Sequence, residues 1–333
     1  MASSSSDDAK RARQLFMEDN TYFMALALLS GQRSTDKKAG ACIVKDNKVI
    51  AVGYHQVLSS GGDEYKCHCE YHAEIDAIMN CAHVHGGTMF VTEFPCNECV
   101  KVIVQAGIVR VVYLSEDNED NEDNGDNEDN KDNEDNKDNK DKMKKDAAEK
   151  MLKEGNVGCE KYEGPKDDIC VGITHTFEDP EETENSMKHF MAVAVLTSMK
   201  SRDPRTQVGA CIVRDDKVIV AVGHNQMPRD EAEKYTWGRD RNQDNKHLYV
   251  CHAELNAILS STDSRGCTIY VTHFPCNECA KPLIRAGIKK VFYMSNPYWK
   301  NDEIKASRRM LKEEGIELVS FNKVKEDIVI KFH

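Results

Sequence analysis

A set of one histidine, one glutamate and two cysteines occurs twice in the chain with the same spacing. In both halves a glutamate follows the histidine by two positions, and the first of two cysteines follows it by 24. The hexapeptide FPCNEC contains both cysteines of each set, at residues 94–99 and 274–279. The two sets are His72, Glu74, Cys96 and Cys99, and His252, Glu254, Cys276 and Cys279.

One imidazole and two thiolates make a zinc site with three protein ligands. Structural zinc usually has four ligands, whereas three leave a position for water, whose pKa zinc lowers to about 7. The cysteine pairs are expected in the first turn of a helix, where the helix dipole favours the thiolate. Glu254 is predicted to carry a proton between this water and a substrate, and Glu74 holds the same place in the first half. The pattern predicts a hydrolytic zinc centre.

Either motif alone is a weaker signal. A Cys-x-x-Cys can be a redox pair or half of a structural zinc site, and His-x-Glu is common by chance. Here both occur in the same order in each half, at expected helix starts. The combination of His-x-Glu with Pro-Cys-x-x-Cys is typical of zinc-dependent nucleobase deaminases.

The two halves align well beyond the hexapeptide. Residues 22–36 align with residues 189–203, and from His72 to Ser115 the offset to the second half is a constant 180. This similarity indicates a tandem duplication, and 333 residues are enough for two domains. The expected domains span residues 15–176 and 184–333, with a linker near residues 177–185.

Each copy predicts the same order of elements. An amphipathic helix precedes a two-stranded hairpin, after which helices and strands alternate. This order implies a mixed sheet with helices on its faces, an α/β sandwich. In the second copy we expect helices at about 186–200, from His252, from Cys276 to Gly287 and at about 302–314, and a strand at 267–272.

The net charge of −12 is concentrated in one segment. Residues 116–142 carry 14 acidic residues against 4 lysines in a three-residue repeat without an apolar residue. We expect a disordered insertion inside the first domain, because such a segment buries nothing that offsets its loss of entropy. A Ca²⁺-binding loop from Asp120 is the alternative, but its twelfth position is Lys131 rather than glutamate.

The chain has no apolar run long enough for a membrane span and no signal sequence at its start. Thirteen cysteines, an odd number, favour reduced thiols over a disulfide framework. We therefore expect a cytoplasmic protein that has no membrane partner.

Residues 186–333 resemble the deoxycytidylate (dCMP) deaminase family. The resemblance rests on S-x-DP-x-TQVGACIV, G-x-N-x-MP, VCHAELNAI and GC-x-IYVT-x-FPCNECAK. It implies two tandem cytidine-deaminase-like α/β/α sandwich domains, each a mixed sheet flanked by helices. It also implies hydrolysis of dCMP to dUMP and ammonia on the route to thymidylate. The implied roles are zinc on His252, Cys276 and Cys279, a proton shuttle at Glu254 and a place beside the nucleotide sugar for Asn225.

The same resemblance implies an oligomeric enzyme regulated by dCTP and dTTP with Mg²⁺. Because the family's subunits associate, a chain with two copies is expected to form an internal pseudo-dimer as well as a homo-oligomer.

Side chains for the nucleotide's phosphate and base are less clear from the sequence. Arg202 and three other arginines could bind a phosphate, although a solvated basic rim fits them equally well. Tyr298 and Trp299 could stack on the base or simply pack as aromatic residues. The other arginines are Arg205, Arg239 and Arg241.

The first half departs from the family pattern where substrate would be held. The loop STDKKAG is two residues shorter than its counterpart, and His55 replaces the asparagine. The segment before the His-x-Glu motif is ten residues shorter. We expect zinc on His72, Cys96 and Cys99, and the principal active site in the second half.

Cys67, His68 and Cys69 stand just before His72 and could belong to a second metal site. Three ligands so close in sequence cannot all reach one ion comfortably, so reduced surface residues are the favoured interpretation.

Two other functions compete with dCMP deamination. Polynucleotide deaminases share the zinc motif but normally present a basic track with aromatic residues. This chain is acidic, and near neutral without its repeat, which disfavours a nucleic acid partner. A zinc scaffold without activity would not need Glu74 or Glu254. Another free cytosine nucleotide stays open as the substrate.

Overall fold

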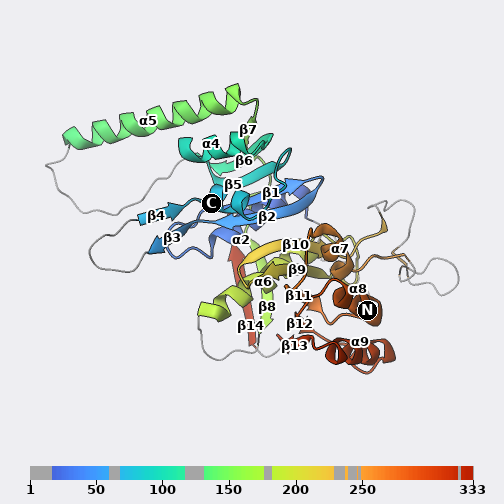
Figure 1. Ribbon diagram of the computed structural model, residues 1–333. Coiled ribbons are helices and arrows are strands. Elements are labelled where there is room, and N and C mark those ends of the chain that lie inside the picture. The colour runs from blue at the N-terminus through green and yellow to red at the C-terminus, as the bar shows by residue number, and fades with distance from the viewer. Residues whose placement is uncertain are drawn as a thin grey trace, which may run out of the picture.

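The protein is described from a computed structural model. The structure describes residues 17–59, 68–116, 131–175, 182–228, 237–238, 246, 249–321 and 324–332. Within these residues the chain forms two five-stranded mixed sheets, one in each half, with helices packed on their faces (Figure 1). This arrangement confirms the expected fold class of two α/β/α sandwiches.

The first sheet has the strand order β2-β1-β5-β6-β7. Strand β1 is antiparallel to both of its neighbours, whereas β5, β6 and β7 run parallel. The elements of this half are α2 (Asp19–Gly31), β1 (Gly40–Lys45), β2 (Lys48–Tyr54), β3 (Gln56–Ser59), β4 (His68–Tyr71), α3 (Ala73–Met79), β5 (Thr88–Glu93), α4 (Asn97–Gln105), β6 (Arg110–Ser115), α5 (Lys131–Glu154), β7 (Gly158–Lys161) and β8 (Ile169–His175).

The second sheet repeats this topology as β10-β9-β11-β12-β13. The helices and strands predicted from the sequence of this half are all present, within a few residues of the expected bounds. They are α6 (Glu182–Ser198), β9 (Gly209–Arg214), β10 (Val218–His224), α7 (Ala253–Ser260), β11 (Thr268–His273), α8 (Asn277–Arg285), β12 (Lys290–Ser295) and α9 (Asp302–Glu313), followed by β13 (Glu317–Ser320) and β14 (Val324–Ile330).

Short polar turns set the two hairpins that begin the sheets. Asp46 and Asn47 have φ angles of 50° and 59°, and Asp215 and Asp216 have 51° and 53°. Two successive residues with positive φ form the tight turn that matches the twist of antiparallel strands, and Asn and Asp tolerate it. The charged turn predicted between these strands thus has a defined conformation.

The two halves share one hydrophobic core. Helices α2 and α6 pack together between the two sheets (Figure 1). The Tyr22 hydroxyl lies 2.8 Å from the Thr197 hydroxyl across this contact. Met17 N–H donates to the Met199 carbonyl at 3.1 Å. The expected pairing of the two copies within one chain is therefore a buried interface.

Strands β8 and β14 join the halves a second time. Strand β14, at the end of the second half, runs antiparallel to β8, at the end of the first, from Val324↔His175 to Ile330↔Ile169. The Tyr162 ring lies 5.9 Å from the Phe332 ring beside this ladder. Nothing in the local sequence patterns predicted this pairing.

The expectation of disorder across residues 116–142 is wrong for its last part. Helix α5 begins at Lys131 and continues to Glu154. Its C-terminal turns pack on α4 and bury Ala148 and Leu152, so the ordered end extends the helix back into the repeat. Residues 117–130, which include most of the alternative Ca²⁺ loop, lie outside the described residues.

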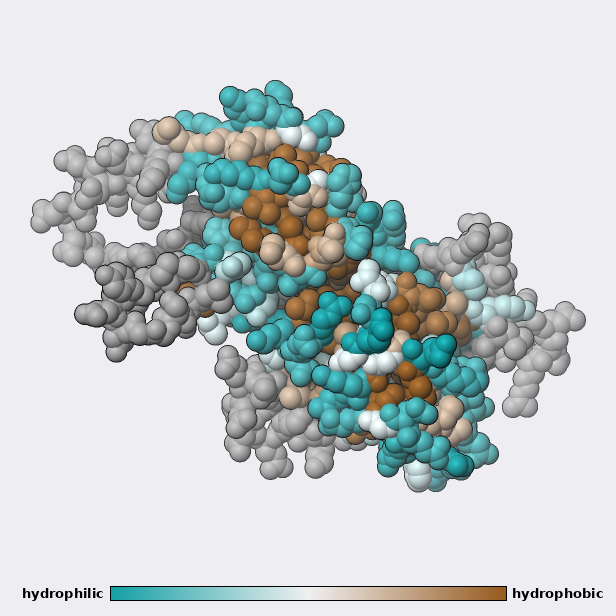
Figure 2. All heavy atoms as spheres, in the orientation of Figure 1, coloured by the Kyte–Doolittle hydropathy of each residue, from teal (hydrophilic) through white to brown (hydrophobic). Residues whose placement is uncertain are grey.

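In Figure 2 hydrophobic residues show in both halves between larger hydrophilic areas. No helix in the described parts of the chain is both long and apolar enough to span a membrane.

The domain limits at 176 and 184 stay predictions, since residues 176–181 lie outside the described residues.

Candidate active site

Two helix starts bring the three ligands of the second half together. His252 is the N-cap residue of α7, and Cys276 is the N-cap residue of α8. Cys279 lies in the first turn of α8. The Nδ1 atom of His252 is 3.3 Å from the Cys279 sulfur and 3.4 Å from the Cys276 sulfur. All three donor atoms lie within 4.8 Å of one another, as ligands of one small ion must.

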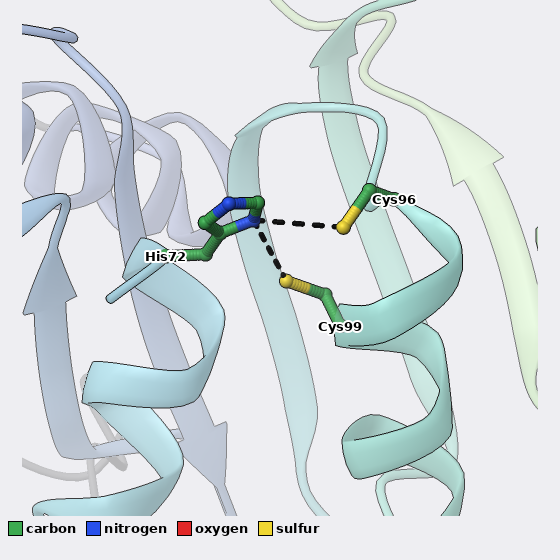
Figure 3. Close-up of side chains that lie close together, drawn as sticks. All are labelled: His72, Cys96 and Cys99. Atoms are coloured by element: carbon green, nitrogen blue, oxygen red, sulfur yellow. Dashed lines mark hydrogen bonds between the residues drawn. The ribbon is translucent and has the colours of Figure 1, made fainter. Parts of the chain in front are cut away.

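The first half repeats this geometry with little change. His72 Nδ1 lies 3.5 Å from the Cys96 sulfur and 3.3 Å from the Cys99 sulfur. Both sulfurs, from the start of α4, face the His72 ring (Figure 3). The sequence prediction of two equivalent three-residue groups is confirmed as geometry.

The two cysteines of each group differ in acidity. A hydrogen bond from Cys279 and the nearby His252 lower the pKa of Cys276 to about 4. The pKa of Cys279 is raised, because this thiol donates to Cys276 and is buried. The hydrogen bond with Cys276 raises the pKa of His252 to about 9. The lowered pKa of Cys276 favours the thiolate, which is the form in which cysteine binds a metal.

A buried glutamate lies beside each group. Glu254 is 4% exposed and Glu74 is 8% exposed. Burial raises the pKa of both carboxyls. Neither belongs to the set of donor atoms that meet at the metal position. A carboxylate held next to a metal site without being a ligand suits proton transfer better than metal binding.

The space beside the two groups differs greatly. In the second half a pocket of about 540 Å³ reaches His252, Glu254 and Cys276. The equivalent space of the first half, beside His72 and Glu74, is about 70 Å³. Ligand pockets usually measure roughly 300–1,000 Å³. Only the second of these two spaces is large enough for a nucleotide.

His55 explains part of this difference. It replaces the asparagine of the second half, is 3% exposed and lines the small cavity. Its ring lies 6.0 Å from the ring of His72, and its Nε2 lies 3.6 Å from Glu70. The imidazole, which is larger than the amide of Asn225, therefore takes up part of the space beside His72.

Asn225 lies in the wall of the large pocket, as expected, but its amide is engaged by the protein. Its Oδ1 accepts a hydrogen bond from Val208 N–H at 2.7 Å. Its Nδ2 donates to the Thr206 carbonyl at 3.0 Å and lies 3.4 Å from Asp203 Oδ2. Asn225 thus holds the surrounding loop in place, whatever contact it makes with a sugar.

Arg202 is not brought to this pocket, which corrects the sequence expectation. Arg202 is exposed, whereas Ser201 and Asp203 on either side are buried at 0% and 3%. It lines a different cavity of about 580 Å³ between the two halves. Arg205 is exposed, and Arg239 and Arg241 lie outside the described residues.

Tyr298 lines the pocket and is 50% exposed, as a residue at its rim would be. Trp299 is 61% exposed and is not among the residues that line the pocket. Lys300 lies over its ring at 5.1 Å. Cys67 and the side chains of His68 and Cys69 lie outside the described residues.

Sequence reasoning missed two charged residues of the pocket wall. Lys246 and Asp203 form an ion pair and both line the pocket. Asp203 stands in a motif that the sequence analysis singled out because of its arginines, not because of the aspartate. Lys246 is one of many charged residues in its segment, so no local pattern marked it.

The sequence pattern of the cytidine and deoxycytidylate deaminase zinc-binding region matches residues 17–115 and 184–295. These two matches cover more than half of the chain and include both His/Cys/Cys groups. The chain belongs to the cytidine and deoxycytidylate deaminase family. The one imidazole and two thiolates of each group fit the zinc that names this region.

Named relatives match about half of this family member. Deoxycytidylate deaminase of Homo sapiens is 46% identical over 150 residues, 44% of this chain and 84% of that protein. Probable deoxycytidylate deaminase of Caenorhabditis elegans is 45% identical over 151 residues, 43% of this chain and 75% of that protein. A solved structure of cyanophage S-TIM5 dCMP deaminase in complex with dCMP and dUMP is 30% identical, covers 41% of this chain and 96% of that chain, and has a TM-score of 0.34.

Proposed function

We propose that the second domain deaminates dCMP to dUMP by hydrolysis and releases ammonia. The observation that carries this proposal is the pocket of about 540 Å³ that joins the His252, Cys276 and Cys279 group to the buried Glu254. The relatives named deoxycytidylate deaminase support the choice of nucleotide, since the human one is 46% identical over most of its own length.

The residues divide the work of this reaction. Zinc held by His252, Cys276 and Cys279 would supply the Lewis acidity that makes a water nucleophilic near neutral pH. Glu254 is placed to take a proton from a water and give it to the ring nitrogen N3, and then to pass a second proton, from the hydroxyl formed at C4, to the departing amine. A C–O bond forms at C4, the C4–N bond breaks, and dCMP and water become dUMP and ammonia. The low exposure of Glu254 keeps bulk water from competing for this proton.

The first domain is proposed to bind zinc without converting a nucleotide. Its ligands and Glu74 are in place, but the adjoining cavity of about 70 Å³ accommodates a few waters rather than a nucleotide. We therefore propose two zinc ions per chain and one working active site.

The remaining features follow from the family resemblance. We propose that Asn225 and Tyr298 line the substrate's sugar and base, respectively, and that dCTP and dTTP with Mg²⁺ act as effectors of a cytoplasmic homo-oligomer. The large pocket contains both side chains.

A substrate panel tests the proposal. The purified, zinc-loaded chain is offered dCMP, CMP, deoxycytidine, dCTP and single-stranded oligonucleotides, and ammonia release is measured. We expect dCMP to be turned over, Glu254→Ala to abolish turnover and Glu74→Ala to keep most of it. Activity on oligonucleotides without activity on dCMP would contradict the proposed substrate. Equal losses in the two glutamate variants would contradict the division between domains.

A further inference from the structure

Asp203 and Lys246 form an ion pair inside the wall of the second-domain pocket. The ammonium of Lys246 donates to Asp203 Oδ2, and the two side chains are 3% and 2% exposed. Removing one partner of such a pair leaves a buried charge that nothing compensates. The two buried side chains therefore depend on each other.

The carboxylate of Asp203 organises the loop around it. Its Oδ1 accepts hydrogen bonds from the backbone N–H groups of Arg205 at 3.0 Å and Thr206 at 3.2 Å. Its Oδ2 receives Lys246 and lies 3.4 Å from the Asn225 amide. One side chain thus connects two loop residues, a strand end and a lysine from a distant segment.

This network continues to the metal group. Gln226, next to Asn225, exchanges backbone hydrogen bonds with Cys251 at 3.1 and 2.8 Å. Cys251 directly precedes the ligand His252. The Lys246 carbonyl accepts from the N–H of Val250 at 2.9 Å, so the lysine is also tied to the start of α7 through the backbone. The wall and the metal ligands are therefore held at a fixed separation.

The first domain lacks this network within its described residues. Asp36 aligns with Asp203 but is exposed, and its N–H bonds to the Ser34 hydroxyl at 3.4 Å. His55 stands in the place of Asn225, and the segment that carries Lys246 is ten residues shorter in the first copy. The network occurs in the half that has the large pocket.

The charge of Lys246 also affects how well the pocket can bind an anionic substrate. Asp203 faces a pocket that has to admit a nucleotide monophosphate, which is an anion. An unpaired carboxylate in that wall would repel the phosphate, and a low local dielectric would strengthen the repulsion. The ammonium of Lys246 removes this repulsion while the carboxylate keeps its structural contacts.

We propose that Lys246 is a positioning residue for the second-domain reaction, which neutralises Asp203 and through it holds the wall of the pocket that also contains Glu254. This inference rests on the proposed deamination of dCMP. It assigns Lys246 to substrate binding rather than to the chemical step, because the lysine is bound to Asp203 and not to the metal group.

The test compares KM and kcat for dCMP and for the uncharged deoxycytidine in three zinc-loaded chains. These are the wild type, Lys246→Met and the double variant Asp203→Asn with Lys246→Met. We expect Lys246→Met to raise KM for dCMP about 10-fold or more, which corresponds to about 1.4 kcal/mol, with kcat within about 3-fold of wild type. The KM for deoxycytidine, where it is measurable, should rise less. The neutral double variant should recover most of the loss for dCMP.

Lys150→Met serves as the matched control, because Lys150 lies 3.9 Å from Glu154 in an exposed pair on the other domain. Its KM and kcat should equal those of wild type. Zinc content and the thermal midpoint are recorded for every chain. If Lys246→Met does not fold, the double variant is compared directly with wild type. A KM for dCMP within about 10-fold of the wild-type KM then supports the proposal, and a larger KM contradicts it.

A fall in kcat with unchanged KM in Lys246→Met would overturn the positioning role. A double variant no better than Lys246→Met would also overturn it, since coupling through Asp203 would then be absent. A wild type that does not convert dCMP contradicts the proposed function itself. A wild type that converts dCMP beside an unaffected Lys246→Met contradicts this inference alone.

Discussion

Arg33 and Lys200 occupy equivalent positions in the two repeats but make different contacts across the interface. The guanidinium of Arg33 lies 4.3 Å from the Tyr54 ring and 4.9 Å from the Phe190 ring, and donates to the Lys217 carbonyl at 2.9 Å. Lys200 instead pairs with Asp19 and borders the cavity of about 580 Å³ between the halves. The two repeats therefore use this position differently, with two ring contacts at Arg33 and an ion pair beside a cavity at Lys200.

Arg33→Ala should lower the stability of the whole chain. The substitution removes contacts with two rings and a hydrogen bond that spans the halves, together worth about 2 kcal/mol. Denaturant unfolding monitors the effect, and Arg265→Ala is the control because the Arg265 side chain is 83% exposed. An Arg33→Ala chain as stable as the control would show that these contacts do not hold the halves together.

Replacing one ligand at a time, in either half, should show that the two metal groups bind zinc independently. Cys279→Ser and Cys99→Ser should each lower the zinc content from about two to about one per chain, because each group has only three protein ligands to begin with. Only Cys279→Ser should abolish dCMP turnover. Elemental analysis gives the zinc content, and loss of both ions in one variant would mean that the groups are not independent.

Gly223 and Gly53 mark a close approach that has to stay free of side chains. A Cβ on Gly223 would lie 2.4 Å from the Ala253 carbonyl oxygen, and one on Gly53 would lie 2.3 Å from that of Ala73. Alanine at either place should cost about 1–3 kcal/mol of stability through overpacking. Gly223→Ala should also lower kcat/KM for dCMP, because it displaces the helix that begins at His252.

Gly53→Ala is the matched comparison, since it strains the same contact in the first half. The Gly53→Ala protein that folds should have the same kcat/KM for dCMP as the wild type. Equal activity losses in the two variants would contradict the assignment of the active site to the second half.

His224 should make the protein less stable in acid. Burial first, and then Lys200 and Arg202, lower its pKa to about 4. The unfolded chain binds a proton at this histidine below its usual pKa of about 6.5, whereas the folded chain does not until about pH 4. Stability from this group is therefore present above pH 6.5 and is lost as the pH falls through that window.

Replacing His224 by Asn should make the stability depend less steeply on pH between about 6.5 and 4. The free energy of unfolding of both chains is measured across this range at one zinc concentration. Identical slopes in the two chains would show that His224 takes up its proton equally in the folded and unfolded states.

The sequence predicted features that depend on local patterns and on the repeat. Helices starting at His252 and Cys276 follow from motif spacing and apolar periodicity, which are properties of short stretches of the chain. The sequence showed shorter loops in the first half, and the cavity there measures about 70 Å³ against about 540 Å³ in the second half.

Features that depend on distant contacts were not predictable. Arg202 lines the cavity between the halves rather than the second-domain pocket, which the charge pattern does not reveal. Lys246 is significant only because Asp203 lies beside it in space. Helix α5 begins earlier than composition suggests, since its packed end favours helix in the repeat before it.

The pairing of β8 with β14 affects how the chain can be made in a cell. A ribosome completes the first half, including Ile169–His175, long before it synthesises Val324–Ile330. Domains usually fold in the order of synthesis, but here one strand has to wait for a partner at the far end of the chain. Until β14 is synthesised, the nascent protein exposes an unpaired β-edge that other chains can join. A chain truncated before Val324 lacks the partner strand of β8 and is therefore expected to aggregate.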